Sequence, residues 1–214
     1  MRSNFDKQLA VLQNQLTEMA TFIENSIDCA ATALITGDLS KAEKAIEYHN
    51  EIDRMEHDIE ALCLRILLLQ QPVAKDLRVV SAALKMITDM ERIGDQARDI
   101  GEILIDSPHR IKIKADSDIS NMATATIKMV HDVVDAFIKN DIPMAEKVIA
   151  YDDVIDRRYL NTRNRLIEEI RVGDLDVNAE VDLLSIAKYF ERIGDHATNI
   201  AEWVIFSITG RHKL

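Results

Sequence analysis

The chain has 214 residues, with 37 acidic and 26 basic side chains and a formal net charge of −11. This negative balance argues against a nucleic-acid partner and an anionic membrane surface, because no basic patch is available to neutralise phosphates. Three prolines, six glycines and an aromatic content of 5% favour an all-helical protein over a sheet protein.

Prolines and glycines divide the chain into six predicted helices. Pro72 and Pro108 follow long periodic segments, and Pro143 suits the first turn of a helix. Gly37 and Gly173 mark the other two breaks. The predicted helices are residues 4–36, 40–70, 75–106, 117–140, 143–171 and 178–209.

The start of the second predicted helix carries a capping signature. Ser40 followed by Glu43 has the spacing of a capping box, in which two side chains satisfy free N–H groups of the first turn. The sequence therefore predicts that the cap lies at Ser40.

An internal repeat organises these helices. Residues 91–102 (ERIGDQARDIGE) and 191–202 (ERIGDHATNIAE) agree at eight of twelve positions, and residues 52–54 recur as 155–157. Helices one to three thus repeat as helices four to six. Short connections favour antiparallel packing, so we expect an all-α fold of two tandem three-helix antiparallel bundles packed side by side. The predicted units are residues 1–108 and 109–214.

The third helix of each predicted unit carries a row of carboxylates. Glu91, Asp95 and Asp99 fall within 80° of one another at 100° per residue, and the second unit matches them with Glu191 and Asp195. Like charges at this spacing cost roughly 0.2–0.5 kcal/mol per pair. This repulsion counts against a simple solvated face and makes a ligand site an alternative to it, although Arg92 and Arg98 can offset part of the repulsion through pairs with Asp95 three residues away.

A glycine lies inside each acidic motif. Gly94 and Gly194 are both in mid-helix, where glycine costs about 1 kcal/mol relative to alanine. A cost repeated in both units indicates a position that needs free space or a close approach.

The second helix of each unit can complete the site. Asp53 and Asp156 occupy equivalent positions, and four residues before them stand His49 and Asp152. Because adjacent antiparallel helices face each other, these groups can meet the acidic row across a groove. Such an oxygen-rich site suits iron, manganese or magnesium, with zinc also possible. His196 is a further candidate ligand.

Two further interpretations of these residues remain open. A carboxylate di-iron or iron-storage protein of ferritin type would use Glu-x-x-His motifs, and the sequence has none. A metal-free helical scaffold would use the acidic row only for solubility. Metal content distinguishes the metal-free scaffold from a metal-binding protein, and an assay for ferroxidase activity or oxygen turnover tests the iron protein.

The remaining features predict a soluble, cytoplasmic protein. Cys29 and Cys63 are isolated thiols in apolar helical patterns, which fits buried, reduced cysteines. No N-terminal apolar signal segment is present. Long bundles with apolar faces such as residues 203–206 predict a homodimer, although that segment is equally compatible with the core.

Together these motifs resemble those of the PhoU family of bacterial phosphate regulators. The resemblance rests on the two ERIGD motifs and on residues 71–78 (QPVAKDLR) before the first of them. It implies iron or zinc binding, including multinuclear clusters, with manganese or magnesium as further options. The ligands that it implies are Asp53, Glu91, Asp95, Asp99, Asp152, Asp156, Glu191 and Asp195. His49 in place of an aspartate and Asn199 in place of Asp99 leave open whether the two sites hold equal numbers of ions.

The resemblance also implies a function. It indicates a non-enzymatic adaptor, with no catalytic residue, that negatively regulates phosphate uptake and the phosphate-starvation response. The implied partners are the ATPase subunit of an ABC phosphate transporter and a phosphate-sensing histidine kinase.

Overall fold

The protein consists of six long helices. The structure, a computed structural model, describes residues 2–107, 111, 113, 117–173 and 177–211. The helices are α1 (Arg2–Thr36), α2 (Leu39–Gln70), α3 (Lys75–Asp106), α4 (Asp118–Lys139), α5 (Ile142–Val172) and α6 (Val177–Thr209). No predicted bound differs from these by more than two residues, and the described part of the chain holds no strand.

The helix ends follow from local chemistry, with one correction to the prediction. Asp38, not Ser40, caps α2: its carboxylate accepts a hydrogen bond from the Ser40 backbone N–H at 3.1 Å. The chain turns at Gly37 and Gly173 with φ of 74° and 80°, a left-handed conformation that glycine adopts without steric cost. Pro143 lies in the first turn of α5, as expected, and Pro108 lies outside the described residues.

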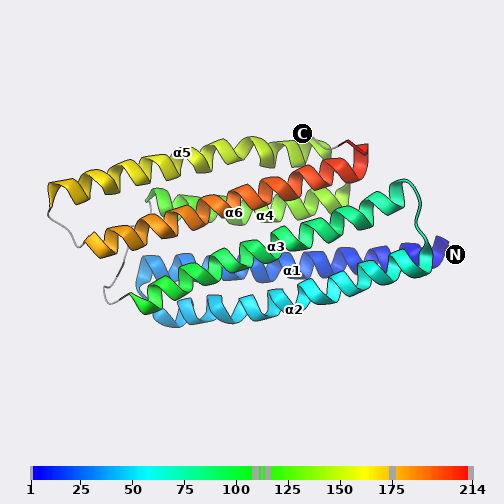
Figure 1. The fold of residues 1–214 in the computed structure, drawn as a ribbon, viewed down its shortest axis with the longest axis horizontal. Coiled ribbons are helices and arrows are strands. Elements are labelled where there is room, and N and C mark those ends of the chain that lie inside the picture. Colours follow the sequence, from blue (N-terminus) through cyan, green and yellow to red (C-terminus); the bar gives the residue numbers. More distant parts are fainter. Residues whose placement is uncertain (1, 108–110, 112, 114–116, 174–176, 212–214) are drawn as a thin grey trace.

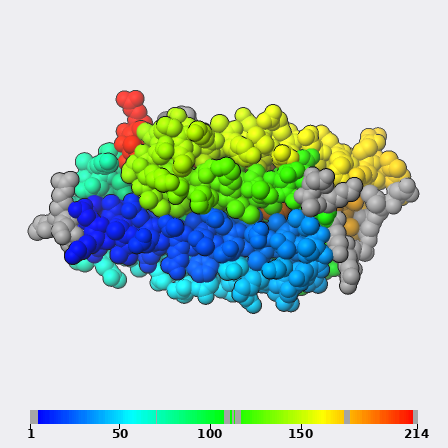
Figure 2. Space-filling view, turned by 180° about the vertical axis from the view of Figure 1, so that it is seen from behind, coloured from blue at the N-terminus to red at the C-terminus, as the bar shows by residue number. Residues whose placement is uncertain are grey.

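The helices form two three-helix units that lie side by side (Figure 1). In one unit α1, α2 and α3 all contact one another, and in the other α4, α5 and α6 do the same. The units meet through α3 against α6 and through α1 against α4. Figure 2 shows the α1–α4 side, where the blue N-terminal helix runs along the yellow-green α4. The predicted duplicated bundle is confirmed.

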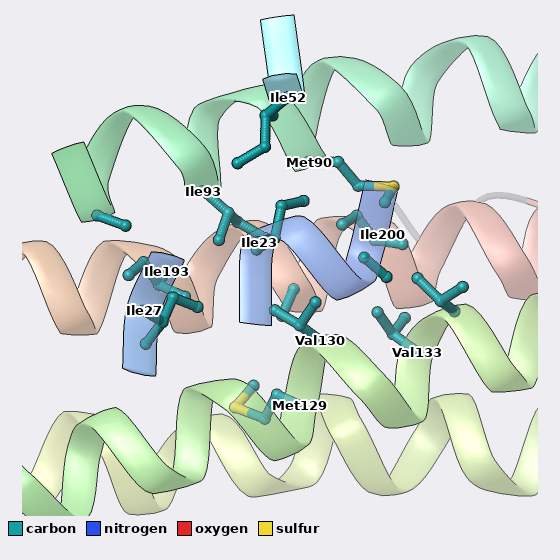
Figure 3. Close-up of a cluster of buried hydrophobic side chains, with 14 of the residues drawn as sticks. Ile23, Ile27, Ile52, Met90, Ile93, Met129, Val130, Val133, Ile193 and Ile200 are labelled. Carbon is teal, nitrogen blue, oxygen red and sulfur yellow. The ribbon is translucent and has the colours of Figure 1, made fainter. Parts of the chain in front are cut away.

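The apolar core runs without interruption across the boundary between the units. Figure 3 shows side chains from both units in one cluster, among them Ile23 of α1, Ile93 of α3, Val130 of α4 and Ile193 of α6. Each of these four side chains is fully buried. Because burial of such a side chain contributes about 1.5–3 kcal/mol, this shared core holds the two acidic rows in a fixed relation.

The face of α3 opposite the first acidic row is an apolar and buried stripe. Its members are Met90, Ile93, Ala97, Ile100 and Leu104. The stripe anchors α3 in the core, and on the other side of this helix Asp95 Oδ1 lies 3.7 Å from His49 Nε2 of α2. Among the described helices, none combines the length and the apolar character needed to cross a bilayer.

Candidate metal centre

The second unit brings three carboxylates together. Asp152 and Asp156 lie one turn apart on α5, and Asp195 faces them from α6. One oxygen from each carboxylate lies within 4.8 Å of the other two. Among the described residues this is the one group of three or more acidic, histidine or cysteine side chains with that geometry.

Asp152 is the least exposed member of this cluster, and a glycine makes room for it. Its Oδ1 atom is buried and has no hydrogen-bond partner among the described residues. A Cβ placed on Gly194 would lie 2.8 Å from that oxygen. The mid-helix glycine of the second motif therefore allows the close approach that the sequence predicted.

The electrostatics of the cluster are unfavourable without a cation. Burial, together with the carboxylates of Asp195, Asp156 and Glu191, raises the pKa of Asp152 to about 7. Burial also raises the pKa of Asp195, with Asp156 adding to the rise and Lys188 opposing it. Desolvation and like charge both disfavour the ionised form, and a bound cation would reverse that preference.

Glu191 lies beside the three aspartates without joining their cluster. Both of its carboxylate oxygens accept hydrogen bonds from Lys188 one turn earlier on α6. The Lys188 ammonium also lies over the Tyr159 ring, 5.3 Å from its centroid. This ion pair neutralises Glu191 locally, and nothing in the carboxylate pattern alone predicted it.

In the first unit, Asp95, which is equivalent to Asp195, and Asp99, one turn further along α3, are held by arginines. Arg98 Nη1 donates to Asp95 Oδ1 at 2.7 Å, and Arg98 Nη2 donates to Asp99 Oδ1 at 2.7 Å. Arg92 Nη1 donates to the other oxygen of Asp95 at 2.9 Å. Arg98 Nη1 also lies 2.9 Å from His49 Nε2, and since a guanidinium only donates, this nitrogen accepts in the contact.

The other two predicted ligands of the first unit are Asp53 and Glu91, which lie at the edge of this arginine network. The Asp53 side chain is 50% exposed, and its Oδ2 lies 3.7 Å from His49 Nε2. Glu91 Oε2 lies 3.5 Å from Arg92 Nε. Burial, with the charge of Asp95, raises the pKa of Glu91, and Arg92 opposes the rise. The first unit thus presents an ion-pair network rather than an open carboxylate cluster.

His196 and Asn199, which follow the second motif, face the other unit. His196 Nδ1 lies 2.9 Å from Asp89 Oδ1 on α3, and Asn199 Nδ2 donates to the same oxygen at 3.2 Å. These contacts fix α6 against α3 at the centre of the molecule. His196 is therefore placed at the boundary between the units and away from the three aspartates.

Fold and site together define a duplicated three-helix bundle with a carboxylate cluster between two helices of its second unit, α5 and α6. The sequence model of the PhoU domain matches the chain twice, at residues 16–104 and 119–204. The chain belongs to the PhoU family.

Relatives match over almost their whole length. A "Phosphate-specific transport system accessory protein PhoU homolog 1" from Thermotoga maritima is 32% identical, and the match covers 98% of this chain and 90% of the relative. A "Phosphate-specific transport system accessory protein PhoU homolog" from Clostridium acetobutylicum is 34% identical, with coverage of 98% and 96%.

Solved structures agree with the fold. The crystal structure of PhoU from Pseudomonas aeruginosa superposes with a TM-score of 0.87 at 31% identity, covering 97% of this chain and 100% of that one. The regulatory protein PhoU from Streptococcus pneumoniae gives a TM-score of 0.90 at 24% identity, covering 98% and 99%, and at that identity the likeness concerns the fold alone.

Proposed function

We propose that this protein is a metal-binding, cytoplasmic accessory protein of a phosphate transport system. In this role it restrains phosphate uptake and the phosphate-starvation response when phosphate is plentiful. It does so as a non-enzymatic adaptor between the ATPase subunit of an ABC transporter and a sensor histidine kinase, and it acts as a homodimer. Family membership and near-complete coverage of relatives named for phosphate transport support the proposal.

The observation that carries the metal-binding part is the cluster of Asp152, Asp156 and Asp195. Its donors are all carboxylate oxygens, which suit iron, manganese and magnesium, and zinc also accepts such ligands. The buried Oδ1 of Asp152 lacks a partner, and Gly194 leaves room beside it. Neutralising three carboxylates from two helices would tie α5 to α6 and stabilise the second unit.

Elemental analysis tests the metal site. Protein purified without chelators should contain iron or zinc, and Asp156→Asn with Asp195→Asn should remove it while helical circular dichroism is unchanged. Asp153→Asn is the matched control, since Asp153 is an exposed neighbour on α5 outside the cluster. Equal metal content in the cluster variant and the control would show that these carboxylates are not the ligands.

Phosphate uptake tests the regulatory role. Deletion of the gene should raise phosphate uptake and starvation-response transcription in phosphate-replete cells, and the wild-type gene should restore repression. Repression that persists unchanged in the deletion strain would remove the proposed role in phosphate control.

A further inference from the structure

We propose that the Arg98 guanidinium takes the place of a metal ion in the first unit. This chain then binds metal only at the cluster of Asp152, Asp156 and Asp195 in the second unit. The inference rests on the proposed metal binding and concerns where the metal goes. Two of the differences between the units bear on this inference: His49 corresponds to Asp152, and Arg98 corresponds to Thr198. At both positions the first unit has a side chain that serves a guanidinium network, and the second does not.

The Arg98 guanidinium binds two of the predicted first-unit ligands and His49 at the same time. It contacts Asp95 and Asp99 at 2.7 Å each, and His49 Nε2 at 2.9 Å. Its side chain is 28% exposed, and that of Asp95 only 13%. Charge-assisted hydrogen bonds of this kind are roughly twice as strong as neutral ones. A metal ion could bind here only by displacing them.

The equivalent cluster of the second unit lacks such a cation. Thr198 is neutral, and its hydroxyl oxygen is buried without a hydrogen-bond partner among the described residues. Within the described part of the chain no ion pair reaches Asp152, Asp156 or Asp195. The carboxylates of this unit are therefore free to coordinate.

His49 reinforces the difference between the units. Its Nε2, the atom nearest Asp53 and Asp95, accepts from Arg98, so its lone pair is already used. Asp152 at the same position offers a carboxylate oxygen that has no hydrogen-bond partner in the described part of the chain. Both copies of the ERIGD motif thus keep a glutamate and an aspartate four residues apart, while the charged groups around them differ.

The test measures the metal-to-protein ratio after loading with Mn²⁺ or Zn²⁺ and desalting. Asp95→Asn with Asp99→Asn should keep the wild-type ratio, whereas Asp156→Asn with Asp195→Asn should lose the metal. His49→Asp with Arg98→Thr, which copies the second unit into the first, should double the ratio. Arg92→Thr is the control, because it removes a guanidinium from Asp95 and leaves Arg98 in place.

Two results would overturn the inference: loss of metal from the Asp95/Asp99 variant, or no additional metal in the His49/Arg98 variant. Wild-type protein without metal would instead contradict the proposed metal binding. In that case metal uptake by the His49/Arg98 variant still decides the role of Arg98. If the His49/Arg98 variant loses helicity, Arg98→Thr alone is tested instead. It is made in protein that also carries Asp156→Asn and Asp195→Asn. The readout is then a rise in melting temperature on adding Mn²⁺, expected only without Arg98.

Discussion

Gly194 and Asp152 approach so closely that a Cβ on the glycine would lie 2.8 Å from the carboxylate Oδ1. Real Cβ atoms do not tolerate such a contact, so a side chain at position 194 must push Asp152 out of its place. Since the helix itself would gain about 1 kcal/mol from alanine, the glycine is better explained by the site than by the fold.

Gly194→Ala should therefore weaken metal binding without unfolding the protein. We expect a loss of affinity of roughly 10–100-fold, comparable to changes that disturb the orientation of metal ligands. Isothermal titration with Mn²⁺ measures the change, and circular dichroism verifies the helix content. Gly94→Ala is the matched control, since its Cβ would meet the movable Ile52 side chain at 3.0 Å. Equal effects of the two substitutions would disprove a specific role for Gly194.

Asp152→Asn should stabilise the metal-free protein and abolish its stabilisation by metal. The pKa of Asp152 is raised to about 7 in the folded protein. At a pH below this value but above the unfolded pKa, the folded state therefore holds a proton that the unfolded state has released. The free energy of unfolding should then fall as the pH rises from the unfolded value, about 4, to about 7. The asparagine variant lacks this decline.

Urea unfolding in the presence of a chelator, repeated across this pH range, checks the expectation. Asp153→Asn serves again as the control on the same helix. A decline that is as steep in Asp152→Asn as in the wild type would assign the pH dependence to other groups.

Most of the fold could be predicted from the sequence because its signals are local. Helix bounds follow from positions such as Gly37 and Pro143, and the buried stripe on α3 follows from a spacing of three and four residues. The repeat then places equivalent carboxylates on equivalent faces. None of these inferences needs knowledge of contacts between helices.

The site itself could be predicted only in part. Which charged side chains contact one another depends on the rotation of each helix about its axis and on the side-chain rotamers, and the sequence pattern gives neither. The repeat pairs Asp95 with Asp195, yet the first lies in an arginine network and the second in an open cluster. Aligning the two motifs does show that Arg98 corresponds to Thr198, and this difference is the sequence signal for the contrast between the units. It is less conspicuous than the repeated carboxylates. The contact of His196 with Asp89 joins two units and has no local signature.

Gly101→Ala should destabilise the first unit. A Cβ at this position would lie 2.9 Å from the Ala42 backbone oxygen, which cannot move without shifting α2. Overpacking of this kind costs typically about 1–3 kcal/mol, partly offset by about 1 kcal/mol of helix propensity. We expect a net loss, visible as a lower urea midpoint. Gly94→Ala, which meets a movable side chain, should lose less, and the reverse order would refute the backbone argument.

Cys63 should be inert to thiol reagents in the native protein. Its side chain is fully buried, and burial, with a smaller effect of Glu60, raises its pKa to about 12. Because only the thiolate reacts, modification at about pH 8 requires opening of the bundle. In a Cys29→Ser background the reaction with a chromogenic disulfide should be at least roughly 10³-fold slower in buffer than in denaturant. Cys63→Ser, which keeps Cys29, is the control, and fast native labelling of Cys63 would contradict the packing of α2 in the core.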